Sequence, residues 1–71
     1  MIVIATIRGI IPFDINDEPY FMIYFAHESD LDNVLEARLP AGSIYPHPHV
    51  NDHIRVHYLL DIPTRIELIT E

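Results

Sequence analysis

Strict alternation of apolar and polar residues in the last third of the chain most constrains the fold. In segment 53–58, isoleucine, valine and tyrosine alternate with histidine and arginine. Residues 61–63 (Asp-Ile-Pro) interrupt the pattern, and segment 65–69 resumes it. A period of two with β-branched and aromatic residues predicts strands that bury one face. We therefore expect two short consecutive strands that close a small β structure.

The length of 71 residues predicts one domain, 1–71, near the lower limit for a self-sufficient core. The chain has no cysteine, so disulfides and thiolate metal sites are excluded. Self-association is a common remaining way to stabilise so small a chain, and we expect a homo-oligomer. No apolar run approaches the ~18 residues of a membrane span, and residues 1–5 lack the features of a signal peptide. The expectation is a cytoplasmic protein without a membrane partner or a cofactor.

Charge is distributed unevenly along the sequence. The net charge is −7, there is no lysine, and the four arginines are balanced by acids outside residues 14–36. We expect the acidic residues of that stretch to form one patch on two neighbouring loops: Asp14, Asp17, Glu18, Glu28, Asp30, Asp32 and Glu36. Such a patch repels a phosphate backbone, so direct nucleic-acid binding is disfavoured.

Two further strands are predicted in the first half of the chain. In segment 2–13, alternate residues are apolar and are expected to share the buried face: Val3, Ala5, Ile7, Ile11 and Phe13. Gly9 marks a bulge or bend within this strand. Segment 20–26 is apolar on both faces, which one thin core cannot bury. Tyr20, Met22 and Tyr24 should then be exposed on a monomer and form an interface, because tyrosine and methionine are enriched in interface cores.

Residues 29–39 fit either a helix or a strand. Ser29 and Asp32 could cap a helix whose apolar face includes Leu31, Val34 and Leu35. Alternation over 34–39 instead predicts a strand, and Pro40 ends either element. We favour the strand slightly, so the fold class is mainly β, a small five-stranded barrel or curled sheet. The alternative is an α+β order, ββαββ, with a helix at about residues 30–39.

Segment 50–56, Val-Asn-Asp-His-Ile-Arg-Val, followed by the short strand 65–69, resembles part of small OB-like and SH3-like barrels. Those barrels commonly have a Gly-Asp turn before an alternating strand, whereas the glycine is replaced here by Asn51. The resemblance covers the last third well and the first two strands loosely, and it implies a barrel fold. OB-class members that bind single strands use basic, aromatic strands. Nucleic-acid binding does not carry over to this acidic, lysine-free chain.

Candidate chemistry is limited to the histidines. A metal such as zinc or nickel accepts imidazole ligands, and four histidines lie within eleven residues: His47, His49, His53 and His57. On a strand the last two would lie about 13 Å apart, too far to share one ion without a third element. A solvated strand face and an exposed loop explain the same residues. With no cysteine, two serines in turn contexts and no phosphate-binding glycine loop, we expect no enzyme.

These observations favour a non-enzymatic protein–protein interaction module that self-associates through the aromatic second strand. One alternative is an acidic viral or mobile-element inhibitor of a nucleic-acid-handling or host-defence protein, which would present carboxylates in place of phosphates. A second alternative is a barrel that binds a metal or small ligand through its histidine-rich loop. The three differ in what they require of the structure: an uncovered aromatic face, one concentrated acidic patch, or converging imidazoles.

Overall fold

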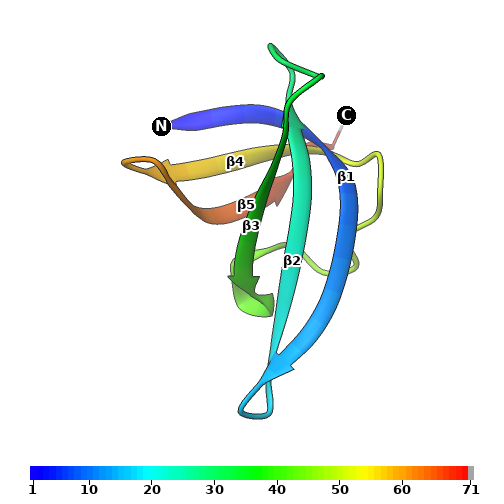
Figure 1. Cartoon of the computed structure of the whole chain (residues 1–71), viewed down its shortest axis with the longest axis vertical. Helices are drawn as coiled ribbons and strands as arrows, with labels where there is room; N and C mark the ends of the chain where they lie inside the picture. Colours follow the sequence, from blue (N-terminus) through cyan, green and yellow to red (C-terminus); the bar gives the residue numbers. More distant parts are fainter. Residues whose placement is uncertain (71) are drawn as a thin grey trace.

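A computed structural model describes residues 1–70 as five strands in one antiparallel sheet, in the order β3-β2-β1-β4-β5 (Figure 1). The elements are β1 (Ile2–Ile15), β2 (Glu18–His27), β3 (Val34–Pro40), the 3₁₀ turn η1 (Ala41–Ser43), β4 (His53–Leu59) and β5 (Ile62–Leu68). The mainly-β prediction is confirmed. The helix considered for residues 30–39 is wrong. The Asp30 N–H donates to the His27 carbonyl at 3.0 Å and the Asn33 N–H donates to the Asp30 carbonyl at 3.3 Å, so two successive turns precede β3.

The sheet curls but does not close into the barrel that the resemblance implied. Its two edge strands, β3 and β5, are not paired with each other in the described chain. Instead, Ile44 after η1 forms an isolated parallel bridge with Ile66 of β5. At Ile66, the segment after η1 therefore occupies the place that β3 would need in order to pair with β5. The result is a strongly curved open sheet whose two edge strands are not paired with each other (Figure 1).

One core lies inside the curl and draws on every strand. It is formed by alternating inward residues of all five strands together with the residue after η1: Ala5, Ile7, Ile23, Phe25, Ala37, Leu39, Ile44, Ile54, Val56 and Ile66. The prediction for β4 and β5 is confirmed, since Ile54, Val56 and Ile66 are buried. Burial of each such side chain contributes on the order of 1.5–3 kcal/mol to the hydrophobic driving force.

A bulge at Gly9 reverses the faces of β1, and this corrects the parity expected for that strand. The register with β2 shifts between Ile7 and Gly9. Beyond the shift, Ile10 packs against the core, while Ile11 is 52% exposed. Because the bulge adds one unpaired residue, every later side chain changes side. The sequence indicated a bulge at Gly9. The predicted buried face nevertheless kept the same alternation on both sides of it, and this is wrong after Gly9.

The loop before β4 is fixed by Asn51 and Asp52. Asn51 has a φ of 77°, the left-handed conformation that glycine adopts most readily, and its N–H donates to the Ile7 carbonyl at 2.8 Å. The Asp52 carboxylate accepts from the Tyr45 hydroxyl at 2.6 Å and from the His49 N–H at 2.9 Å. The Tyr45 bond lowers the pKa of Asp52, and burial followed by that bond raises the pKa of Tyr45. Asn51 therefore adopts at this turn the left-handed conformation that a glycine would adopt most readily.

Candidate protein interface

The outer face of the β1–β2 hairpin carries a continuous apolar strip. The register places Ile11 opposite Met22, and Phe13 opposite Tyr20, on the side of the sheet away from the core. Tyr24 lies opposite Gly9, at the bulge. We call Ile11, Phe13, Tyr20, Met22 and Tyr24 the aromatic strip. The strip contains the three residues predicted for the interface and adds two from β1, which sequence reasoning had assigned to the core.

The residues of the strip cover one another only in part. Phe13 and Tyr20 stack with ring centroids 5.8 Å apart and an interplanar angle of 28°. Tyr24 lies over Gly9, where a Cβ would be 3.3 Å from its Cδ2. Tyr20, Met22 and Tyr24 are consequently half-buried, rather than fully exposed as expected. On β3, exposed Glu36 and Arg38 flank the strip opposite Tyr24 and Met22.

The structure separates the predicted acidic patch into two ends. Asp14, Asp17 and Glu18 lie at the β1–β2 turn, whereas Glu28, Asp30 and Asp32 lie in the β2–β3 loop at the opposite end of the molecule (Figure 1). A ten-residue strand, β2, separates the two groups, which corresponds to roughly 33 Å. Glu36 lies on β3 beside the strip. The loops are therefore not neighbours, and no single concentrated patch forms from these residues.

The four candidate histidines are not brought together either. His47 and His49 are exposed in the loop before β4, and His53 begins that strand. His57 hydrogen-bonds through Nε2 to Glu67. Within residues 1–70, no group of three or more histidine, aspartate or glutamate side chains is arranged to hold one metal ion. The histidines are close in sequence but do not meet in the structure, because β4 is extended and spaces its outer side chains along one face.

A charged network occupies the outer face of the β4–β5 hairpin. Glu67 accepts from His57, and Arg65 Nη2 lies 3.6 Å from the Glu67 carboxylate and 3.4 Å from His57 Nε2. The bond from His57, followed by the nearby positive charge of Arg65, lowers the pKa of Glu67. Arg55 is paired directly opposite Glu67. This half of the outer face satisfies its own polar groups and needs no cover.

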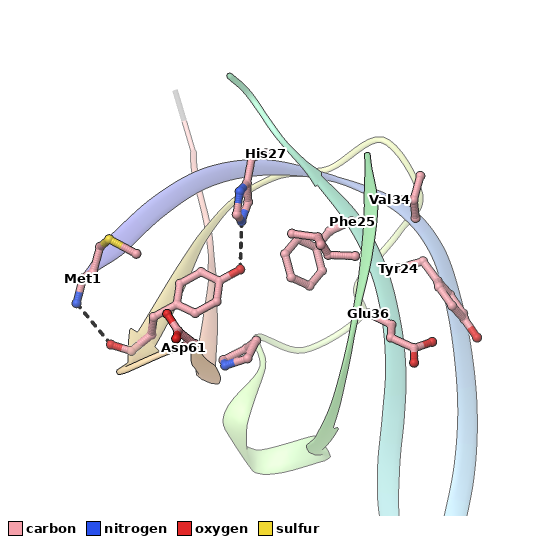
Figure 2. Close-up of a pocket in the computed structure, with 10 residues that line it drawn as sticks. Met1, Tyr24, Phe25, His27, Val34, Glu36 and Asp61 are labelled. Atoms are coloured by element: carbon pink, nitrogen blue, oxygen red, sulfur yellow. Dashed lines mark hydrogen bonds between the residues drawn. The ribbon is translucent and has the colours of Figure 1, made fainter. Parts of the chain in front are cut away.

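A groove of about 800 Å³ opens in the gap between β3 and the β4–β5 turn (Figure 2). Its lining is mostly apolar and comes from both sides of the gap: Met1, Tyr24, Phe25, His27, Val34, Leu35, Glu36, Tyr58, Asp61 and Pro63. His27 Nε2 and the Tyr58 hydroxyl share a hydrogen bond of 2.8 Å inside it. Burial raises the pKa of Tyr58. Sequence reasoning missed this groove because it exists only where the curled sheet fails to close.

An exposed apolar cluster adjoins the groove at the β4–β5 turn. Met1 is held there because its carbonyl accepts from the Tyr58 N–H at 2.7 Å. We call the cluster the apolar tip; its members and their exposed fractions are Met1 77%, Ile2 56%, Leu59 69%, Leu60 85% and Ile62 65%. A signal for it was present in the sequence, since Leu60 is the first residue of a two-residue turn, where glycine, asparagine or aspartate is usual, and it follows Leu59 at the end of β4.

Comparison with protein-family models, with curated proteins and with solved structures found no match for this chain. In the described part of the chain, no helix combines the length and the apolar character needed to cross a bilayer. The assignment of a function therefore depends on the surfaces themselves.

Proposed function

We propose that this protein is a non-enzymatic protein–protein interaction module that self-associates through the aromatic strip. The observation that carries the proposal is the register of β1 and β2, which aligns five apolar side chains on one outer face. Aromatic residues and methionine supply most of the binding energy in interface cores. Association of two strips would bury them without any change in the fold.

The residues beside the strip suit contact with a second copy. Glu36 and Arg38 are exposed two positions apart on the same face of β3. In a twofold dimer, the same surface meets itself, so the Glu36 of each copy can face the Arg38 of the other. The two acidic ends of the molecule lie away from the middle of the strip. A self-complementary charge pair therefore flanks an apolar centre, as in many interfaces.

The required area is available. A standard interface buries about 800 Å² per partner, which is roughly one sixth of the 4929 Å² that the chain exposes. Because both copies are acidic, added salt should screen their repulsion and strengthen the dimer. Charge mimicry of nucleic acid toward a basic partner would show the opposite dependence, with binding weakened by salt.

The test is the oligomeric state of the wild-type chain and of a Met22→Asp, Tyr24→Asp double variant, measured by sedimentation equilibrium across a salt series. We expect a dimer at micromolar concentration that tightens with salt, and a monomeric double variant. The matched control is Ile4→Asp with His53→Asp on the outer face of the β1–β4 pair, which should remain a dimer. A wild-type monomer, or equal dissociation of both variants, would refute the proposal.

A further inference from the structure

The groove and the adjoining apolar tip form a second surface, which shares only Tyr24 with the aromatic strip. We propose that this surface binds an extended segment of a partner protein that carries apolar residues and a basic side chain. The segment would lie in the groove beside β3, with apolar side chains against the tip and its cation near Asp61. The inference is independent of self-association through the strip.

Apolar contact is the first requirement of an occupant. The groove is lined by Phe25, Leu35 and Pro63, and exposed Leu60 stands next to Asp61 of this lining in the β4–β5 turn. Contiguous apolar surface of this kind marks a site of protein interaction more often than isolated exposed residues do. The groove is open along the gap in the sheet (Figure 2). An elongated occupant fits this shape better than a compact one.

Charge gives the second requirement. Asp61 lies on the β4–β5 side of the groove, whereas the Glu36 side chain extends from the far side of β3, beside Tyr24 (Figure 2). Among the described residues that line the groove, none is lysine or arginine. The Met1 ammonium group lies in the same lining and donates to the Tyr58 carbonyl at 3.1 Å. A lysine or arginine of the occupant would therefore meet the Asp61 carboxylate without a competing cationic side chain.

The edge of β3 explains why the occupant should be extended. β3 is the last strand of the sheet, paired only with β2. Every second residue of an edge strand points its N–H and C=O groups away from its neighbour, where an added strand can pair with them. Val34, Leu35 and Glu36 line the groove from this edge. A segment laid in the groove can thus pair with the backbone of β3 while its side chains contact the floor and the tip.

The conformation of Leu60 supports a binding role for the tip. Leu60 has a φ of 58°, in the left-handed region, and is 85% exposed. A leucine there costs about 1 kcal/mol relative to asparagine or glycine, and it recovers little by burial within the chain. Residues held in such conformations concentrate at functional sites. The cost is explained if the side chain of Leu60 is buried by a partner.

The probe is a displayed library of random decapeptides, selected on the wild-type protein. Peptides enriched by the wild type should alternate aliphatic residues with at least one lysine or arginine. Leu60→Asn and Asp61→Asn should each weaken the best synthetic peptide by about tenfold, measured by calorimetry. The matched controls Leu31→Asn and Asp17→Asn change an exposed leucine and an exposed turn carboxylate elsewhere, and should leave affinity within about twofold.

Backbone pairing has its own readout. N-methylation of alternate amides in the best peptide gives two series, because only every second amide faces β3. One series should lose binding and the other should retain it. Equal tolerance of both series, or equal binding by the wild type and the Leu60 and Asp61 variants, would overturn the proposal.

The same variants distinguish a partner peptide from other molecules that could cover the groove and the apolar tip. Failure to enrich any peptide, together with binding of the wild type but not Leu60→Asn to phosphatidylcholine vesicles, would assign the tip to a lipid surface and overturn the proposal. Loss of dimerisation in Leu60→Asn would assign the tip to a second copy and overturn it equally. Peptide binding that persists in an Ile11→Asp, Met22→Asp variant, neither of whose residues lines the groove, would separate this surface from the aromatic strip, whether or not the strip forms a dimer.

Discussion

The β1–β2 and β4–β5 hairpins share one construction and differ in where they expose apolar residues. Each has a two-residue turn, one bulge and an inner face buried in the common core. The β1–β2 hairpin has a polar turn, Asn16-Asp17, and an apolar outer face. The β4–β5 hairpin has an apolar turn around Leu60 and a charged outer face. Since the core beneath is shared, burial in the core does not account for the difference between the two hairpins.

The two turns make the contrast sharpest. Asn16 and Asp17 have φ values of 49° and 68°, and both residue types tolerate the left-handed region. Leu60 adopts a φ of 58° without that tolerance. The residues of the first turn favour its conformation, whereas the second turn has a residue that disfavours it at its most exposed position. A turn that opposes local preference in this way indicates selection for something other than stability.

The largest expected effect tests whether both hairpins depend on the same core. Ile23 of β2 and Ile54 of β4 are both fully buried. Replacing either by alanine should cost about 3 kcal/mol of unfolding free energy, because each leaves a cavity in one close-packed interior. Urea denaturation measures the loss. Where an alanine variant does not fold, Ile→Val at the same positions should cost about 1 kcal/mol each. Two separate unfolding transitions, each shifted by only one of the two changes, would show that the hairpins have separate cores.

Exchange of turn residues should have opposite effects at the two hairpins. Leu60→Asn should raise the unfolding free energy by about 1 kcal/mol, because asparagine adopts the left-handed region more readily. Asn16→Leu should lower it by a similar amount for the converse reason. Both changes are measured by thermal and urea unfolding. Destabilisation by Leu60→Asn would mean that Leu60 is already used inside the fold, and would remove the contrast between the turns.

Sequence periodicity predicted the strands well and the surfaces poorly. Alternation depends on burial of one face, so Ile54, Val56 and Ile66 were assigned correctly. Beyond Gly9 the predicted buried face of β1 is wrong, because a bulge moves all later side chains to the other face of the sheet. Periodicity alone does not give the position of a bulge within a strand. Ile11 and Phe13 were thereby assigned to the core and joined the aromatic strip instead.

Features that depend on distance between segments could not be predicted from local pattern. The acids of 14–36 are close in sequence, yet β2 holds its two groups at opposite ends. The groove depends on the failure of β3 and β5 to pair. The bridge between Ile44 and Ile66 is part of that arrangement, and it joins segments far apart in the sequence. The double leucine at 59–60 was a readable local signal for the apolar tip. It contradicts turn preference, and such contradictions are where function is to be sought.

A smaller effect concerns the bulge beneath the aromatic strip. Gly9→Ala places a Cβ 3.3 Å from Tyr24 Cδ2, so the ring must move by a few tenths of an ångström. Because Tyr24 is only half-buried, the ring can yield, and stability should change by less than about 0.5 kcal/mol. In a Tyr24→Ala background the same change should stabilise by about 0.5 kcal/mol, since only the entropy loss of the unfolded chain remains. Additivity in this double-mutant cycle would show that Tyr24 does not rest on Gly9.

The smallest effect concerns the charged outer face of the β4–β5 hairpin and is read by titration. Hydrogen bonding from His57 lowers the pKa of Glu67. A lowered folded-state pKa means that the stabilisation is complete above the ordinary glutamate value, about 4.3, and is lost as the pH falls through the folded-state value. In His57→Val, the pKa of Glu67 should rise toward that ordinary value, followed by carboxyl-carbon NMR. Arg65→Gln should raise it less, because the charge of Arg65 acts more weakly than the His57 bond. If Glu67 titrates at the same pH in the wild type and in His57→Val, the outer face of this hairpin is not a self-satisfied network. The contrast with the uncovered aromatic strip would then rest on the apolar residues alone.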